Sequence, residues 1–127
     1  MEIVRAAADA FNRRDVEAFR ALTANDVEIV PIRAVLEGTI YRGPDAVARW
    51  YAAIDDSWEA LTVEIEELRD AGDRVLTLGR IRGRGRGSGA AIDVEAAALT
   101  EFRDGLITRW HNYTDRAEAL EAAGLSE

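Results

Sequence analysis

The sequence of 127 residues predicts an α+β domain in which a curved antiparallel sheet wraps around helices. Apolar residues recur at helical spacing in the first part of the chain. From Leu61 onward they alternate with polar residues, as in strands that have one solvated face. Turn residues divide this second part into long segments that can pair with one another. A chain of this length can bury one core, so we expect residues 1–127 to form a single domain.

Two helices are predicted at the start of the chain. The apolar residues of segment 3–11 have i, i+3 and i+4 spacing, so one face of an amphipathic helix should pack on the core. Asp15 can cap a second, short helix. We expect residues 25–26, an Asn-Asp pair, to form the turn that ends this helix, and residues 27–31 to form a short strand.

A third helix should follow Gly43-Pro44-Asp45, because Gly suits an N-cap and Pro fits the first helical position. Its apolar stripe has i, i+3, i+4, i+7 spacing and consists of Val47, Trp50, Tyr51 and Ile54. These aromatic side chains, with Trp58 beyond them, either stack on a ligand or simply belong to the core.

Long strands are predicted from residue 61 to residue 114. Asp115 and Glu118 form a capping box that opens a last helix, and Gly124 ends it. Glycine-containing turns separate the strands at residues 71–73, 87–89 and 104–105.

Composition narrows the classes of partner. A net charge of −8 and a pI near 4.7 disfavour nucleic acid and anionic membranes, because binding to polyanions needs clustered Lys and Arg. The sequence has no cysteine, so it offers no disulfide and no thiolate ligand for a metal. It also has neither a secretory leader pattern nor an apolar stretch long enough to span a bilayer. We therefore expect a cytoplasmic protein without a metal or a cofactor.

Four segments carry a resemblance to a known family. They are AFNRRDVEAFRALTANDVEIVP (residues 10–31), YRGPDAVARWYAAI (41–54), AGDRVLTLGRIRGRG (71–85) and TEFRDGLITRWHNYTDRAEALEAAGL (100–125). Their order and spacing resemble the NTF2-like fold and, more narrowly, its SnoaL-like branch. The resemblance implies a cone-shaped sheet around three N-terminal helices, a short C-terminal helix, and a cavity on the concave face of the sheet. This fold hosts isomerases, dehydratases, cyclases, epoxide hydrolases and binding modules, so it fixes no reaction.

The last strand offers two sets of side chains, because neighbours on a strand point to opposite faces. Epoxide hydrolases of this fold read W-R-D-Y-F-D where this chain reads W-H-N-Y-T-D, at residues 110–115. The resemblance implies that Asn112 faces the cavity, in the place of the catalytic acid. It also puts Gly79 and Ile81 where those enzymes keep an Arg and a second Asp. An amide is no general base, so epoxide hydrolysis by that route is not expected.

Two other mechanisms of the fold lose their acids in the same comparison. The proton-transfer positions of ketosteroid isomerases fall on Ala7, Pro31 and Ala98, and none of these can move a proton. Polyketide cyclases of the SnoaL type resemble enzymes with a cavity carboxylate, which again falls on Asn112. A carboxylate from another part of the chain, such as Glu37, remains the alternative.

The expected cavity lining is apolar, with a few neutral hydrogen-bonding groups. Our leading hypothesis is a homodimeric protein that binds a small apolar molecule, with any catalysis unassigned. The alternatives are an isomerase, cyclase or dehydratase acting on an apolar carbonyl substrate, in which Asn112 polarises the carbonyl and Tyr41 or a carboxylate moves the proton, and a non-catalytic interaction module. It also remains open that the inward side chains only fill a core. The predicted ligand-contact residues are Asn112, Trp110, Thr114, Ile81, Ile29, Ala98, Thr100, Tyr41 and Trp50.

We interpret two further features, the single histidine and a run of arginines, as structural and not as functional. His111, the only histidine, falls on the outer face of the last strand by parity. Arginines alternate with other residues from Arg80 to Arg86, so their side chains should project from one face of one strand. We expect them to pair with acids such as Asp93 and Glu95, and not with RNA.

Overall fold

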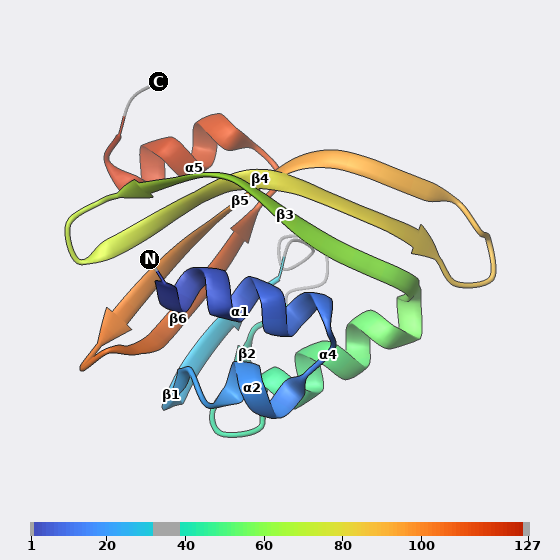
Figure 1. Cartoon of the computed structure of the whole chain (residues 1–127), viewed down its shortest axis with the longest axis horizontal. Coiled ribbons are helices and arrows are strands. Elements are labelled where there is room, and N and C mark those ends of the chain that lie inside the picture. The colour runs from blue at the N-terminus through green and yellow to red at the C-terminus, as the bar shows by residue number, and fades with distance from the viewer. Residues whose placement is uncertain (1, 32–38, 126–127) are drawn as a thin grey trace.

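The computed structural model describes residues 2–31 and 39–125 (Figure 1). Its helices are α1 (Glu2–Asn12), α2 (Val16–Arg20), α4 (Ala46–Ser57) and α5 (Arg116–Ala123). Its strands are β1 (Thr23–Val30), β2 (Tyr41–Arg42), β3 (Trp58–Asp70), β4 (Arg74–Gly85), β5 (Ala91–Arg103) and β6 (Leu106–Tyr113). Glu37 lies outside the described residues.

The described strands form one sheet in the order β2-β1-β6-β5-β4-β3. All neighbours are antiparallel except β1 and β6, which are parallel. Figure 1 shows a strongly curved sheet with α1, α2 and α4 on its concave side and α5 across the opposite side. The predicted curved α+β architecture is therefore confirmed.

A glycine allows β3 and β4 to bend together. The pairing of these strands shifts register between Ile65 and Glu67, and Ile65 pairs with Gly79. A Cβ atom on Gly79 would lie 1.9 Å from the backbone oxygen of Glu64, closer than any side chain can approach. Only glycine fits this bulge without movement of the backbone.

Two apolar clusters lie on opposite sides of the sheet. The larger one joins the concave face to α1, α2 and α4 and includes Phe11, Phe19, Val47 and Trp50. The smaller one joins the convex face to α5. Helix α5 therefore covers part of the outer face, by contacts that include Leu76, Leu78, Leu99 and Leu120.

Several predicted helix boundaries are confirmed. Asp15 caps α2 by accepting a hydrogen bond from the backbone N–H of Ala18. Asp115 caps α5 in the same way, by accepting from Ala117 and Glu118. Gly124 ends α5 with a φ of 74°, in the left-handed region.

Two boundary predictions are wrong. Asn25 and Asp26 lie inside β1, because pairing with β6 begins already at Thr23 and overrides the local preference for a turn. The N-cap position of α4 is Asp45 instead of Gly43, and the Asp45 side chain makes no capping hydrogen bond. Gly43 has a φ of +94° and donates its N–H to the Val27 carbonyl, so it forms part of the turn before the helix.

Candidate ligand-binding site

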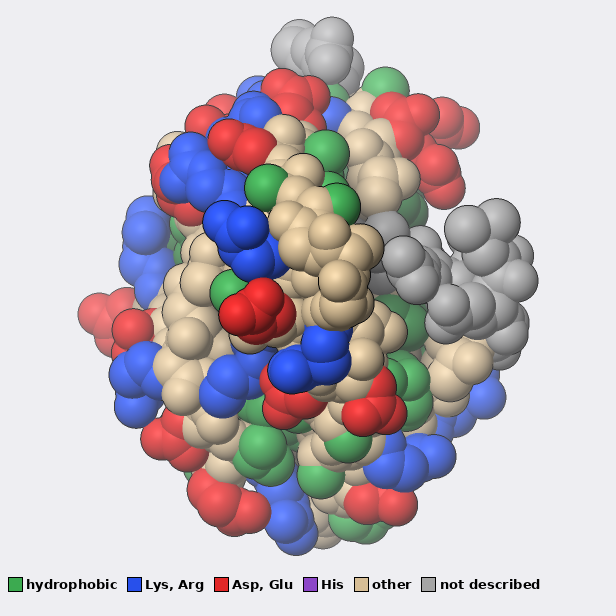
Figure 2. All heavy atoms as spheres, turned by 90° about the vertical axis from the view of Figure 1, so that its right-hand side faces the viewer, with side chains coloured by type: hydrophobic (Ala, Val, Ile, Leu, Met, Phe, Trp, Pro, Cys, Tyr) green, Lys and Arg blue, Asp and Glu red, His purple; other side chains and the backbone are tan. Residues whose placement is uncertain are grey.

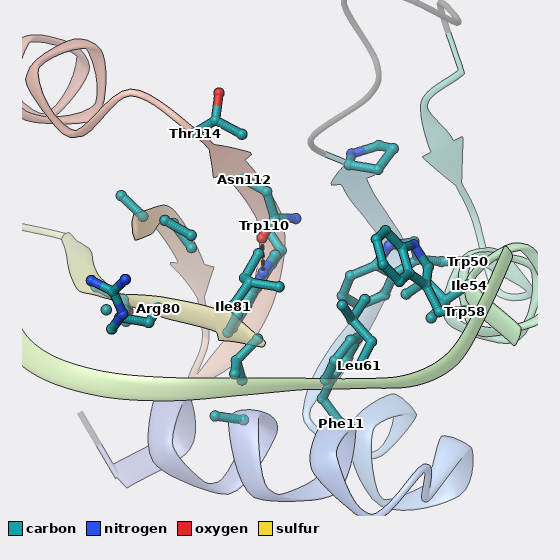
Figure 3. A pocket seen from close by; sticks show the side chains of 18 of the residues that line it. Phe11, Trp50, Ile54, Trp58, Leu61, Arg80, Ile81, Trp110, Asn112 and Thr114 are labelled. Carbon is teal, nitrogen blue, oxygen red and sulfur yellow. Dashed lines mark hydrogen bonds between the residues drawn. The ribbon is translucent and has the colours of Figure 1, made fainter. Parts of the chain in front are cut away.

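A cavity of about 470 Å³ lies between the concave face of the sheet and the helices (Figure 3). This volume is in the range that holds drug-sized ligands. Its helical wall includes Phe11, Phe19, Trp50 and Ile54, and its sheet wall includes Leu61, Val63, Ile81, Ala98, Trp110 and Asn112.

Small residues form the floor of the cavity. Gly79 pairs with Ala96 across β4 and β5, and Thr77 pairs with Ala98 one row further along. These residues line the cavity, and their small side chains leave the concave face open at this level. The volume of the cavity therefore depends on residues that have little or no side chain.

Aromatic rings from the helices and from β6 form a further part of the cavity wall. The ring of Phe19 contacts Trp50 and Trp110 edge-on, with centroid distances of 5.7 and 5.6 Å. The Phe11 ring lies 5.2 Å from that of Trp50. Such mutual contacts fix the rings in one arrangement, so the wall is formed before any ligand arrives.

Helix α1 is held against the edge strand β3 by side-chain bonds to the backbone. The Asn12 amide donates to the Val63 carbonyl at 2.9 Å and accepts from the Val63 N–H at 2.8 Å. Arg14 donates to the Leu61 carbonyl at 3.0 Å. These bonds cover part of the strand edge and keep the Phe11 side of α1 against Leu61 and Val63.

Asn112 is the best-defined polar group of the cavity. Its Oδ1 accepts a hydrogen bond from the indole Nε1–H of Trp110 at 3.1 Å, and its Nδ2 donates to the Val30 carbonyl at 3.1 Å. An indole can only donate and a carbonyl can only accept, so both partners assign the same amide orientation. Figure 3 shows the Trp110 bond as a dashed line.

Thr77 is the second neutral group in this row. Ala98 separates it from Asn112, since Ala98 pairs with Thr77 on one side and with Asn112 on the other. The Thr77 hydroxyl oxygen is buried and has no hydrogen-bond partner among the described residues. A ligand that crosses Ala98 would therefore meet one polar group on each side.

The charged side chains at the cavity have partners elsewhere. Arg80 binds Asp93 at 2.7 Å, and the Glu64 carboxylate is bound by Arg82, although Arg80 and Glu64 both border the cavity. Tyr51 lies outside the lining, and burial raises the pKa of its phenol. Among the described residues no three His, Cys, Asp or Glu side chains come together to bind a metal.

Comparison with known proteins identifies the family of this chain. The family model for the SnoaL-like domain matches residues 4–110. The chain belongs to the SnoaL-like domain family. A search of curated proteins found no match.

Solved structures share the fold of this SnoaL-like domain. A hypothetical protein with a ketosteroid isomerase-like fold from Catenulispora acidiphila, in complex with trimethylamine, is 29% identical with a TM-score of 0.79. The match covers 98% of this chain and 94% of that one. A candidate polyketide cyclase from Xanthomonas campestris pv. campestris is 26% identical over 96% of this chain and 94% of its own, with a TM-score of 0.71. TerC, co-crystallised with polyporic acid, is 22% identical over 97% and 96%, with a TM-score of 0.79.

Most of the predicted contact residues line the SnoaL-like cavity. They are Asn112, Trp110, Thr114, Ile81, Ala98, Tyr41 and Trp50. Ile29 and Thr100 were expected there and lie outside the lining. Both are fully buried, because each pairs with Trp110, whose large side chain shares their row of the concave face.

The positions at which related enzymes keep catalytic residues also fall at the cavity, with one exception. Gly79, Ile81, Pro31 and Ala98 all line it, whereas Ala7 is buried in α1 outside the lining. Sequence reasoning missed most of the helical contribution, which includes Ala8, Phe11, Phe19, Ile54 and Ser57, whereas Trp58, the first residue of β3, is predicted as either a ligand contact or a core residue. Their apolar periodicity was the available signal, but the same pattern also describes a filled core.

The side chains of His111 and Arg82 lie on the outer side, as parity predicts, whereas Arg80 also borders the cavity. The imidazole stacks on Tyr113 at 4.2 Å, and its burial, with the charge of Arg109, lowers the pKa of His111. Asp93 binds both Arg80 and Arg82. Arg86 lies beyond β4 and donates to the carbonyls of Asp55 and Trp58, so the expectation that all four arginines share one strand is wrong for Arg86.

Proposed function

We propose that this SnoaL-like protein binds a small, neutral, mostly apolar molecule in the cavity on the concave face of its sheet. The observation that carries this function is the lining itself, in which aromatic rings and small residues predominate and the neutral hydrogen-bonding groups include Asn112, Thr77 and Thr114. The charged side chains at its border, Arg80 and Glu64, are held by Asp93 and Arg82. Binding of this kind gains its energy from buried apolar area and its orientation from a few hydrogen bonds.

The relatives support a small-molecule role. The Catenulispora protein, 29% identical, forms a complex with trimethylamine. In the described part of the present chain, no helix is long and apolar enough to cross a bilayer. A small-molecule binding protein of the cytoplasm fits both observations.

A second candidate is a cyclase or isomerase acting on a neutral carbonyl compound. It is favoured by the similarity to the candidate polyketide cyclase from Xanthomonas. Asn112 would polarise the carbonyl, and the phenol of Tyr41, the ionisable side chain of the described lining that has no ion pair, would move the proton. Replacement of Tyr41 by Phe would then abolish turnover and leave binding unchanged.

A homodimer through the outer face of the sheet completes the proposal. Helix α5 occupies the middle of that face, so the contact would use the charged rows beside it, where Glu28, Arg109 and Glu101 alternate. The internal ion pairs of Arg80 and Arg82 argue against nucleic acid as the partner. A pure interaction module would use the same rows without any ligand.

Thermal unfolding in the presence of neutral bicyclic compounds tests the binding function. A ligand that binds only the native state raises the unfolding midpoint in proportion to the logarithm of its concentration. We expect such a shift for the wild type. We expect a smaller one for Asn112→Asp, because an aspartate cannot donate to the Val30 carbonyl and places a negative charge in the apolar cavity. The absence of any shift over a broad panel would exclude a ligand-binding role.

A further inference from the structure

The amide of Asn112 has one hydrogen-bonding group left over. Its two N–H groups and its oxygen together offer more bonds than Trp110 and Val30 use. The second Nδ2–H has no partner among the described residues. Since Asn112 is half-buried and lines the cavity, this N–H is available to whatever occupies the space.

A free donor constrains a ligand more strongly than a free acceptor does. Oxygens that accept a single hydrogen bond are common in protein interiors, whereas an N–H that a bound ligand covers and leaves without an acceptor costs its full desolvation free energy. Oδ1 already accepts from the indole N–H, so the unmet requirement of Asn112 is an acceptor for Nδ2–H. A ligand atom with lone pairs, such as a carbonyl oxygen, satisfies it.

The acceptor is expected to be neutral. A carboxylate would also accept this bond, but it would leave water for a cavity without a free cation in its described lining. The cationic side chain of that lining is Arg80, and its guanidinium is held by Asp93. The cavity therefore favours a ketone or an amide over an acid.

Trp110 helps to determine where the free N–H points. Its indole N–H holds Oδ1 while the Val30 carbonyl holds one Nδ2–H, so the two bonds together fix the plane of the amide. Without the indole, the amide could tilt about its remaining bond to Val30. The ring itself is fixed by Phe19, with 5.6 Å between centroids. Trp110 thus acts through Asn112, separately from its own apolar contact.

We propose that the cavity selects neutral ligands that carry a carbonyl-type oxygen, which accepts from the free Nδ2–H of Asn112, and that Trp110 is the positioning residue for this bond. This inference rests on the proposed binding function and adds the chemical class of the ligand. The carbonyl lies beside Ala98, and the body of the ligand extends toward Thr77, which is two strand spacings or about 10 Å from Asn112.

Three probes of nearly equal size separate the relevant effects: 2-acetylnaphthalene, 2-ethylnaphthalene and 2-naphthoate. Their affinities are measured by equilibrium dialysis against the full chain. We expect the ketone to bind about three- to tenfold more tightly than the hydrocarbon, the range of one net hydrogen bond. The carboxylate should bind most weakly.

Variants assign this preference to the two residues. In Asn112→Leu the ratio of the ketone affinity to the hydrocarbon affinity should fall to about one, because leucine cannot donate the hydrogen bond that favours the ketone. In Trp110→Phe the ratio should fall as well, because Oδ1 of Asn112 loses the indole donor that helps to orient the amide. Both probes lose the same apolar contact with the indole, so the ratio of their affinities isolates the effect on the hydrogen bond. Tyr113→Phe is the matched control on the opposite face of β6 and should leave the ratio unchanged.

The outcomes distinguish failure of the carbonyl preference from failure of the binding function. Equal affinities for ketone and hydrocarbon in the wild type, or a ratio that survives Asn112→Leu, overturn the inference and leave the binding function standing. Tighter binding of 2-naphthoate overturns the requirement for neutrality. Failure of all three probes to bind contradicts the proposed function and the inference together.

Discussion

The two faces of the sheet differ in chemistry although the same strands supply both. On β6 the side chains of Trp110 and Asn112 face the cavity, while Arg109 and His111 lie on the outer side. Strand β4 divides in the same way, with Ile81 inside and Arg82 in ion pairs outside. The period of two in the sequence thus sorts charge to one face and leaves a neutral surface on the other.

The outer face neutralises its charges by pairing them across strands. Arg42 binds Glu28 at 2.9 Å, Glu28 binds Arg109 at 3.2 Å, and Arg109 binds Glu101 at 3.4 Å. This alternating row spans four neighbouring strands (Figure 1). Figure 2 shows the same mixture of acidic and basic side chains on the adjoining side of the molecule. We infer that the outer face contributes stability and contacts, and the inner face contributes binding.

The largest expected effect comes from a change that forces the paired strands β3 and β4, which supply both faces, apart at their bulge. Gly79→Ala places a Cβ atom against the Glu64 carbonyl oxygen and should lower the free energy of unfolding by about 3 kcal/mol or more. Gly85→Ala is the control on the same strand, because its Cβ would meet chiefly the movable Ser88 hydroxyl. Urea denaturation compares them. If both variants were equally stable, the bulge at Gly79 would not shape the sheet.

Filling the inner face should remove binding without unfolding the protein. Ala98→Met projects a flexible apolar side chain from the floor into the cavity, and we expect the affinity for 2-acetylnaphthalene to fall by about tenfold or more, which is about 1.4 kcal/mol. Ala91→Met adds the same group at an exposed position outside the lining of the same strand and should have no effect. Unchanged affinity in Ala98→Met would mean that the ligand binds elsewhere.

Breaking the charge row should affect stability alone. Glu28→Gln removes the ion pairs to Arg42 and Arg109 and should cost about 1 kcal/mol at low salt, less at high salt. Ligand affinity should not change, since Glu28 lies outside the cavity lining. Denaturation at two salt concentrations, with the exposed Glu121→Gln as control, measures this difference. A loss of ligand affinity in Glu28→Gln would show that the faces are coupled.

The smallest expected effect concerns the outer histidine. Burial lowers the pKa of His111 below its ordinary value of 6.5, so the unfolded chain takes up a proton first as the pH falls. Stability is therefore lost from about pH 6.5 downward to the folded-state pKa. His111→Phe keeps the ring beside Tyr113 and should lose less stability than the wild type between pH 7 and pH 5.5. Equal losses in chemical denaturation would contradict this role.

Much of the inner face could be predicted from the sequence, because strand parity needs only the order of residues. Parity places Trp110, Asn112 and Thr114 in one set, the resemblance to epoxide hydrolases of the fold identifies that set as the inward one, and all three line the cavity. Parity could not show that Trp110 separates Ile29 and Thr100 from the cavity, since that depends on which residues pair across the neighbouring strands. It could not find the bond from Asn112 to Val30 either, because that bond requires the parallel pairing of β1 with β6.

The helical boundary of the cavity was harder to predict for a different reason. An apolar stripe such as that of α4 packs equally well on a filled core and on an open space. The difference lies in the small residues opposite, Gly79, Ala96 and Ala98, and their pairing becomes visible only with the register of β4 and β5.

The pH dependence of ligand affinity tests the central claim most directly, namely that the cavity works with neutral groups. The dissociation constant of 2-acetylnaphthalene, an uncharged probe, is measured from pH 5.5 to pH 8.5 by equilibrium dialysis. We expect values that agree within about twofold, because a group that titrates against the ligand would shift affinity by about tenfold per 1.4 kcal/mol of interaction. An affinity that follows a single ionisation across this range would contradict the account and would identify a proton-transfer group in the site.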